Sequence, residues 1–153
     1  MALEPGDPAP DFTLADQHGD NVTLSDFRGT NVVLYFYPKA DTPGCTAQAC
    51  SVRDHRDEYA DAHATVIGVS PDQVNKIAKF DDKYDLRFPL LADVEHKVAE
   101  AYGVWAEKSM YGRKYMGNER STFVIDPDGK VKAVLRKVKP AEHDELVLTA
   151  LAG

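Results

Sequence analysis

Long apolar blocks along the chain predict the buried strands of a sheet. Residues 31–37, NVVLYFY, form a continuous apolar and aromatic run that is typical of a strand buried on both faces. Residues 64–70, ATVIGVS, form a second run of this kind, and residues 88–92, FPLLA, form a shorter one. We therefore expect three buried strands, with 31–37 as the central one.

Shorter apolar runs come in pairs around turn sequences and predict two hairpins. The segments DFTLA and VTL flank QHGDN at 17–21, and STFVID and KVKAVLRKV flank Asp126-Pro-Asp-Gly129. Aspartate, proline and glycine in this order suit a reversal of the chain. Before the first hairpin, residues 1–11 carry three prolines and predict an extended arm.

Helical spacing of apolar residues predicts four helices. The first runs from Thr42 to about Ala62, because Thr42 suits the N-cap and the following proline suits the first helical position. Its expected apolar stripe consists of Cys45, Ala49, Val52, Arg56 and Tyr59. Ser70-Pro71 opens the second helix, and the other two span 94–102 and 141–151.

The order of these elements predicts an α/β fold, with a central mixed sheet covered by helices on both faces and an N-terminal hairpin. No internal repeat, low-complexity tract or linker divides the chain. With 153 residues, of which 43% are hydrophobic, we expect residues 1–153 to form a single domain. A domain of this size buries about 70% of its unfolded surface.

Charge and hydropathy exclude several classes of function. A net charge of −7 without a cluster of lysine and arginine argues against a nucleic-acid partner. No apolar run reaches the roughly 18 residues of a membrane span, and the first residues, MALEPGDPAPDF, lack the basic and apolar segments of a signal peptide. We therefore expect a soluble, cytoplasmic protein without a membrane partner.

Both cysteines follow the central strand, and one of them stands at a helix start. Cys45 is expected at the third helical position, where free backbone N–H groups and the helix dipole favour the reactive thiolate. Cys50 lies five residues further on. A simpler interpretation stays open at this point, in which Cys45 is a small core residue and Cys50 fills space on an alanine-rich helix.

The segment around Cys45 resembles the active-site motif of a known family. Residues 38–45, PKADTPGC, match the P-x-x-x-T-x-x-C motif of the peroxiredoxins, and Cys50 is similar to the resolving cysteine of the bacterioferritin comigratory protein (PrxQ) subfamily. Further similar segments cover almost the whole chain: APDFTL, FPLLAD at 88–93, YGVWAEKSMYGRKYMG at 102–117 and RSTFVIDPDGKV at 120–131. The resemblance implies a thioredoxin-like fold.

The resemblance also implies a thiol peroxidase that acts on hydrogen peroxide and organic hydroperoxides. Cys45 would be the peroxidatic residue and become a sulfenic acid, which Cys50 would convert to an intramolecular disulfide. A thioredoxin or glutaredoxin-type protein would reduce that disulfide, without a cofactor. Pro38 and Thr42 would belong to the site, with the Thr42 hydroxyl positioning the peroxide. Because the disulfide is intramolecular, we expect a monomer.

Arg120 is expected at the start of a strand, where a solvated charge is the simpler interpretation. Energetics favour a role at the thiol. Lowering the pKa of a thiol from about 8.5 to about 6 requires about 3.4 kcal/mol of preference for the anion, whereas a helix dipole supplies about 0.3 to 1 and at best about 2 kcal/mol. A cation in contact is needed as well. By the resemblance Arg120 is that cation, and Gln48 and Tyr37 contribute surrounding hydrogen bonds.

The histidines do not suggest a metal site. Cys45, Cys50 and His55 are spaced five residues apart, and each step turns about 140° around an ideal helix, so the side chains diverge. The remaining histidines lie among polar residues and are expected to be solvated: His18, His63, His96 and His143. We therefore expect no metal ion and, without a glycine-rich phosphate loop, no nucleotide cofactor.

Two other functions stay open. A dithiol transfer protein of the thioredoxin type is disfavoured, because its chemistry uses C-x-x-C whereas the spacing here is C-x4-C. A non-enzymatic peroxide sensor would use the same thiolate to report to a partner.

The spacing of the cysteines predicts a conformational change if they form a disulfide. Five residues of ideal helix separate two Cα atoms by roughly 8.6 Å, and a disulfide spans at most about 7 Å. A bond between Cys45 and Cys50 would therefore require residues 43–51 to unwind.

Overall fold

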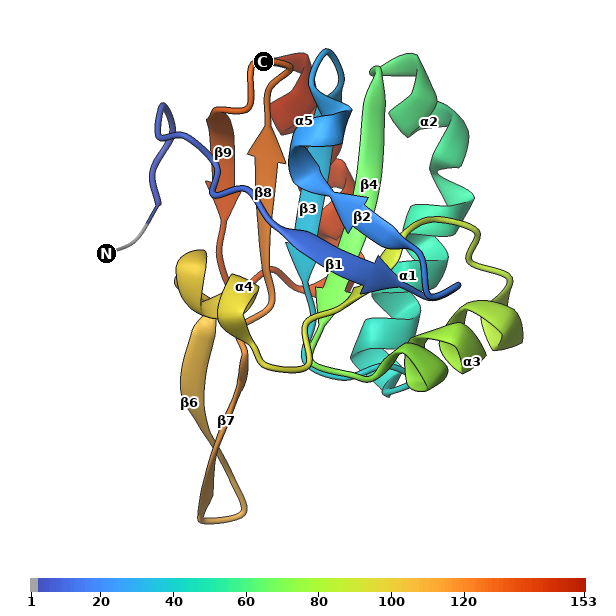
Figure 1. The fold of residues 1–153 in the computed structure, drawn as a ribbon, viewed down its shortest axis with the longest axis vertical. Helices are drawn as coiled ribbons and strands as arrows, with labels where there is room; N and C mark the ends of the chain where they lie inside the picture. The colour runs from blue at the N-terminus through green and yellow to red at the C-terminus, as the bar shows by residue number, and fades with distance from the viewer. Residues whose placement is uncertain (1–2) are drawn as a thin grey trace.

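A computed structural model describes residues 3–153 and shows a mixed sheet between layers of helices (Figure 1). The sheet has seven strands in the order β2-β1-β5-β4-β3-β8-β9, and β6 and β7 form a separate two-stranded sheet. The strands are β1 Thr13–Asp16, β2 Asn21–Thr23, β3 Asn31–Phe36, β4 Ala64–Ser70, β5 Leu90–Ala92, β6 Trp105–Met110, β7 Arg113–Asn118, β8 Ser121–Ile125 and β9 Val131–Leu135. The helices are α1 Pro43–Asp54, α2 Arg56–Asp61, α3 Val74–Tyr84, α4 Lys97–Ala101 and α5 His143–Ala152, with 3-10 turns η1 Leu24–Phe27 and η2 Pro140–Glu142.

Strand β3 is central, as its apolar run predicted. It pairs in parallel with β4 and antiparallel with β8, so that Leu34 lies between Ile67 and Phe123. Side chains on one face of β3 pack under α1, α2, α3 and α5, and those on the other face pack under α4 and the N-terminal arm. Burial on both faces explains why residues 31–36 show no polar alternation.

Both predicted hairpins are confirmed. Strand β1 pairs antiparallel with β2, and β8 pairs antiparallel with β9 around the turn at 126–129. The described part of the N-terminal arm, residues 3–11, runs beside β9, where the Gly6 N–H donates to the Val131 carbonyl oxygen at 2.8 Å. Residues 1 and 2 of the predicted arm lie outside the described residues.

The first predicted helix is wrong in its length and in one position of its stripe. It is broken at His55, whose ring Nδ1 lies 2.7 Å from the Ser51 carbonyl oxygen and competes for it with the backbone N–H. Arg56, which was expected on the apolar stripe, begins α2 and is exposed.

The second predicted helix begins at Val74 and not at Ser70-Pro71. The buried Asp72 carboxylate accepts hydrogen bonds from the Ser70 hydroxyl at 2.9 Å and the Ala40 N–H at 2.7 Å, which hold residues 70–72 in a loop. The other two predicted helices are confirmed, with ends displaced by at most three residues. Of the helices within residues 3–153, none has the length and apolar character needed to cross a membrane.

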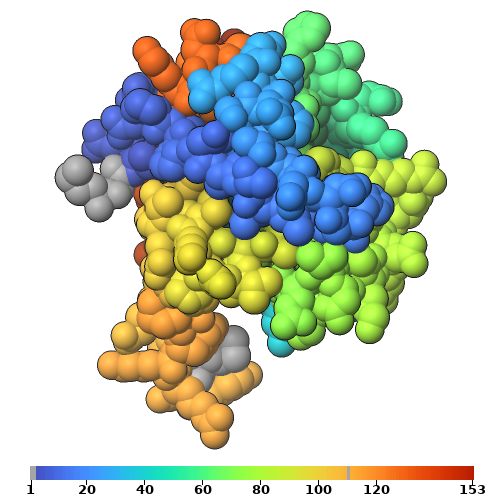
Figure 2. Space-filling model, in the orientation of Figure 1, coloured from blue at the N-terminus to red at the C-terminus, as the bar shows by residue number. Residues whose placement is uncertain are grey.

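The hairpin of β6 and β7 was not predicted. It projects from the body of the molecule (Figures 1 and 2), and the side chains from Arg113 to Met116 are exposed. Backbone pairing between residues 105–110 and 113–118 holds its strands together. Because these side chains face solvent, the segment carries no apolar alternation that could mark it as a strand.

Candidate active site

The end of β3 and the start of α1 position Cys45. Strand β3 ends at Phe36, Pro38 follows, and α1 begins at Pro43 with Thr42 as its N-cap residue. Cys45 is the third helical residue, as predicted, and is only 2% exposed. Its thiol therefore lies in the first turn, where backbone N–H groups lack helical partners and the helix dipole is positive.

Thr42 occupies the predicted N-cap position, but its side chain does not cap the helix. Its hydroxyl donates to the Lys39 carbonyl oxygen at 2.8 Å, and within residues 3–153 it makes no capping bond to α1. The bond closes the loop between Pro38 and α1. Because a hydroxyl both donates and accepts, the Thr42 oxygen keeps lone pairs for a donor that enters the site.

Arg120 contacts both the Cys45 thiol and the Gln48 side chain of α1. Its Nη2 atom lies 3.3 Å from the Cys45 sulfur, and its Nη1 atom donates to Gln48 Oε1 at 2.6 Å. Gln48 is fully buried and so holds the guanidinium in one orientation. Gly44 leaves room for it, since a Cβ atom at residue 44 would lie 3.2 Å from Nη2. Arg120 directly precedes β8, which agrees with its predicted place at a strand start.

Tyr37 does not contribute the expected hydrogen bond. Its side chain is buried, and its hydroxyl has no hydrogen-bond partner within the described residues. Burial raises the pKa of Tyr37, so the hydroxyl stays protonated.

Cys50 lies on α1 and is half-buried. Both cysteines are free thiols, and the helix is continuous from one to the other. The structure therefore represents the reduced form of the protein.

An open cavity of about 380 Å³ lies beside Arg120. Its lining residues come from β6, the link between β7 and β8, and the segment after β9: Ala106, Glu107, Lys108, Glu119, Arg120, Lys137 and Val138. Burial and the charge of Arg120 lower the pKa of Lys108, while the nearby Cys45 acts in the opposite direction. Sequence reasoning missed Lys108, because the exposed hairpin that carries it has no apolar signal.

One expectation about the histidines is wrong. His143 is fully buried, with Nε2 2.9 Å from Thr122 Oγ1 and Nδ1 3.5 Å from an Asp144 carboxylate oxygen. Its neighbours in sequence are polar, but α5 turns this side chain toward β8. His96 stacks on Trp105 with ring centroids 4.0 Å apart. His18 and His63 are exposed, as expected.

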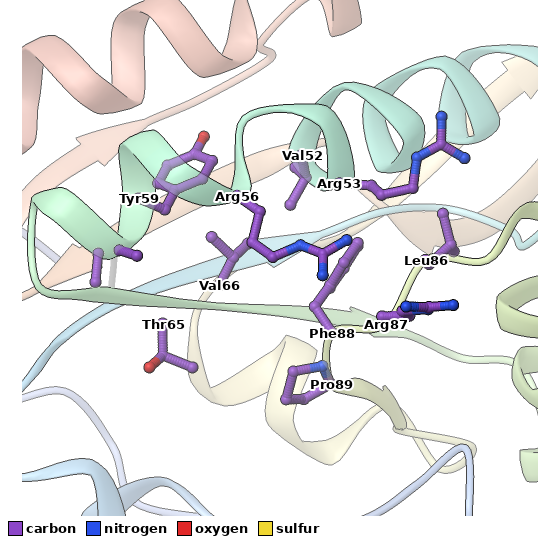
Figure 3. A pocket seen from close by; sticks show the side chains of 12 residues that line it. Val52, Arg53, Arg56, Tyr59, Thr65, Val66, Leu86, Arg87, Phe88 and Pro89 are labelled. Atoms are coloured by element: carbon purple, nitrogen blue, oxygen red, sulfur yellow. The ribbon is translucent and has the colours of Figure 1, made fainter.

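A more enclosed pocket of about 230 Å³ lies beneath the junction of α1 and α2 (Figure 3). Its lining includes neither Cys45 nor Arg120, so it is separate from the thiol site. Its walls are Val52, Arg53, Arg56, Tyr59, Ala60, Ala64, Thr65, Val66, Leu86, Arg87, Phe88 and Pro89. Among residues 3–153, no three His, Cys, Asp or Glu side chains are grouped so that they could hold a metal ion.

The chain is similar to known proteins over nearly its whole length. Residues 5–134 match the AhpC/TSA family. The chain is 51% identical to peroxiredoxin Bcp of Bacillus subtilis over 143 residues, which cover 94% of this chain and 91% of that protein. It is 48% identical to peroxiredoxin Bcp of Escherichia coli K12 over 149 residues, which cover 97% and 96%.

A solved structure agrees with these relatives. The bacterioferritin comigratory protein of Xanthomonas campestris, described for its alkyl peroxide reduction activity, superimposes with a TM-score of 0.89 at 39% identity. The alignment covers 98% of this chain and 96% of that one. The fold is thus the thioredoxin-like fold that the resemblance implied, and the chain belongs to the peroxiredoxins, in the bacterioferritin comigratory protein (PrxQ) subfamily.

Proposed function

We propose that Cys45 is the peroxidatic nucleophile of this peroxiredoxin and that it reduces hydrogen peroxide and organic hydroperoxides. The observation that carries the proposal is the 3.3 Å contact between Arg120 Nη2 and Cys45 Sγ at the start of α1. The guanidinium and the helix start both favour a thiolate over a thiol. The described alkyl peroxide reduction of the Xanthomonas relative supports organic hydroperoxides as substrates.

In the first step the Cys45 thiolate attacks one peroxide oxygen. An S–O bond forms and the O–O bond breaks, so that Cys45 becomes a sulfenic acid and the leaving oxygen takes up a proton to give an alcohol or water. The guanidinium of Arg120 stabilises the charge that develops on the oxygens. The Thr42 oxygen accepts a hydrogen bond from the peroxide, and Pro38 directs the loop toward α1.

Cys50 completes the cycle as the resolving residue. Its thiolate attacks the Cys45 sulfur, the S–S bond forms, and the S–O bond breaks as hydroxide leaves and is protonated to water. A dithiol protein of the thioredoxin or glutaredoxin type then reduces the disulfide and restores both thiols. Because both cysteines lie in one chain, the active form is a monomer of one domain, residues 1–153. Because the cycle needs regenerated thiols, its place is the reducing cytoplasm.

A peroxidase assay coupled to thioredoxin and thioredoxin reductase tests the proposal. Cys45→Ser should consume no peroxide, whereas Cys50→Ser should consume about one equivalent and then stop as a sulfenic acid. Activity in Cys45→Ser would overturn the assignment of the nucleophile. Normal turnover of Cys50→Ser would remove Cys50 from the resolving role. Reduction of insulin disulfides without peroxide turnover would indicate a dithiol transfer protein, and oxidation without turnover would indicate a sensor.

A further inference from the structure

A buried carboxylate joins three helices at the far end of α1. Asp144, near the start of α5, is 4% exposed. Its Oδ2 atom accepts a hydrogen bond from the Ser51 hydroxyl on α1, and its Oδ1 atom accepts one from the Tyr59 hydroxyl on α2. The ring nitrogens of His55 and His143 lie 3.5 Å from the same carboxylate. We call these five residues the Asp144 hub.

Asp144, at the centre of the hub, is ionised, and the groups that donate to it keep their protons. Burial pushes the pKa of Asp144 up, but the nearby His143 ring and the hydrogen bonds from Ser51 and Tyr59 outweigh burial and keep this pKa below its usual value. Burial and the neighbouring carboxylate raise the pKa of Tyr59, so its hydroxyl remains a donor. A buried charge that loses a hydrogen-bond donor is destabilised strongly. The contact between Ser51 and Asp144 therefore resists opening of the helix at Ser51 and beyond it.

Ser51 is the residue that directly follows Cys50. A disulfide between Cys45 and Cys50 requires the intervening helix to open, because their Cα atoms are roughly 8.6 Å apart along an ideal helix and a disulfide spans at most about 7 Å. Helix α1 continues to Asp54. The hub thus holds the first residue beyond the segment that has to open.

Packing on the pocket side of this segment supplies a second restraint. The pocket of about 230 Å³ lies under residues 52–53, and the Val52 side chain points toward it (Figure 3). The Tyr59 ring borders the pocket, while its hydroxyl points away from it. Val52 is nevertheless 3% exposed and belongs to the core, and Arg53 donates to the Tyr84 carbonyl oxygen. The hub and these contacts together hold residues 51–54.

We propose that Asp144 is a positioning residue for disulfide formation, because it stops the unwinding of α1 at Ser51. This inference rests on the proposed roles of Cys45 and Cys50. While residues 43–50 open, the hub keeps Ser51 and the end of α1 in place. The opened segment brings the sulfenic sulfur of Cys45 to Cys50, whose position is restricted by its bond to Ser51. The Cys50 thiolate then forms the S–S bond, and the hydroxide lost from Cys45 is protonated to water. Restricting one reactant raises its effective concentration at the other.

Single-turnover kinetics of Asp144→Asn test this role. Reduced protein is mixed with hydrogen peroxide and quenched at intervals, and dimedone-trapped sulfenic acid and disulfide are separated by mass. Sulfenic acid formation should stay within about twofold of wild type, whereas disulfide formation should be about tenfold slower. Glu145→Gln is the matched control, because it removes an exposed carboxylate from the next position of α5. It should leave both steps unchanged.

Hydrogen exchange of the oxidised protein supplies a readout that a general loss of stability would not reproduce. Because each helical N–H bonds to the carbonyl four residues earlier, opening of residues 43–50 frees the N–H groups of residues 46–54. The oxidised wild type should therefore lose protection over residues 46–54 and keep it over 55–61. Oxidised Asp144→Asn should lose protection over 55–61 as well. If Asp144→Asn does not fold, Tyr59→Phe removes one donor with little change of shape and should show the same changes to a smaller degree.

The outcomes separate this inference from the proposed function. Equal rates of disulfide formation in wild type and variant, with equal protection over 55–61, would overturn the role of Asp144 and leave the peroxidase cycle intact. Absence of a disulfide between Cys45 and Cys50 in the oxidised wild type would overturn both.

Discussion

The Nη2 atom of Arg120 lies 3.3 Å from the Sγ atom of Cys45, although 75 positions separate the two residues in sequence. The pairing of β3 with β8 creates this contact. Phe36 at the end of β3 is in register with Ser121 at the start of β8, so the residue before β8 meets the loop that leads into α1. A cation and a thiol from distant segments thereby meet at the positive end of one helix.

Removal of the Arg120 guanidinium should slow peroxide attack. In Arg120→Ala the thiolate loses its cationic partner, and we expect the rate constant of Cys45 oxidation to fall about 10²-fold, which corresponds to roughly 2.7 kcal/mol. Arg120→Lys should restore only part of the rate, since one ammonium cannot contact both Cys45 and Gln48 as the planar fork does. Stopped-flow oxidation and alkylation by iodoacetamide as a function of pH measure these effects. An unchanged alkylation profile in Arg120→Ala would assign thiolate stabilisation to the helix start or to another cation.

Gly44→Ala should stabilise the helix and slow the chemistry together. Alanine is favoured over glycine inside a helix by about 0.8–1 kcal/mol, but the new Cβ atom would lie 3.2 Å from Arg120 Nη2 and 3.6 Å from Pro140 Cγ. Displacement of the guanidinium should reduce the rate of peroxide attack about threefold to tenfold. Thermal unfolding and stopped-flow oxidation give the two readouts. Ala47→Gly, at an exposed position of α1, is the control because it removes a methyl group from the helix away from Arg120. It should lower stability without changing the rate of peroxide attack.

Oxidation should loosen the first turns of α1. Because an intact helix keeps Cys45 and Cys50 too far apart for a disulfide, the oxidised protein should have less helix by far-UV circular dichroism, faster amide exchange over residues 46–54 and a lower Tm than the reduced protein. Cys50→Ser treated with peroxide should show none of these changes. Identical exchange of residues 46–54 in the two redox states of the wild type would contradict the intramolecular disulfide.

His55 should stabilise the protein more at acid pH than at alkaline pH. The Ser51 carbonyl, followed by the charges of Asp144, Glu58 and Asp54, raises the pKa of His55 above 6.5, against the effect of burial. A raised folded-state pKa gives stability that is complete below about pH 6.5 and is lost as the pH rises through the folded-state value. His55→Gln should therefore lower Tm more at about pH 5.5 than at about pH 8.5. His63→Gln, which replaces an exposed ring, is the control and should change Tm equally at the two pH values. If His55→Gln also lowers Tm equally at the two pH values, His55 does not stabilise the protein through its charged form.

Local patterns in the sequence determined the parts of this protein that depend on neighbouring residues. The apolar run at 31–37 marked the central strand, because a strand buried on both faces needs no polar alternation. Thr42 and Pro43 marked the helix start and hence the place of Cys45, because the first turn accepts proline and has free N–H groups. The resemblance to the family added Arg120 as a partner, and periodicity alone would have left it as a solvated charge.

Tertiary structure alone decided which distant polar groups meet. The contact of Arg120 with Gln48, the burial of His143 and the hub around Asp144 depend on pairing and packing between segments far apart in the chain. A buried polar residue looks like a surface residue in sequence, since its desolvation is offset by partners that no local pattern reveals. The β6–β7 hairpin was not predicted because its strands are exposed. Backbone pairing holds its strands, and both polar and apolar side chains of β7, among them Lys114 and Met116, face solvent, so no hydrophobic period records it.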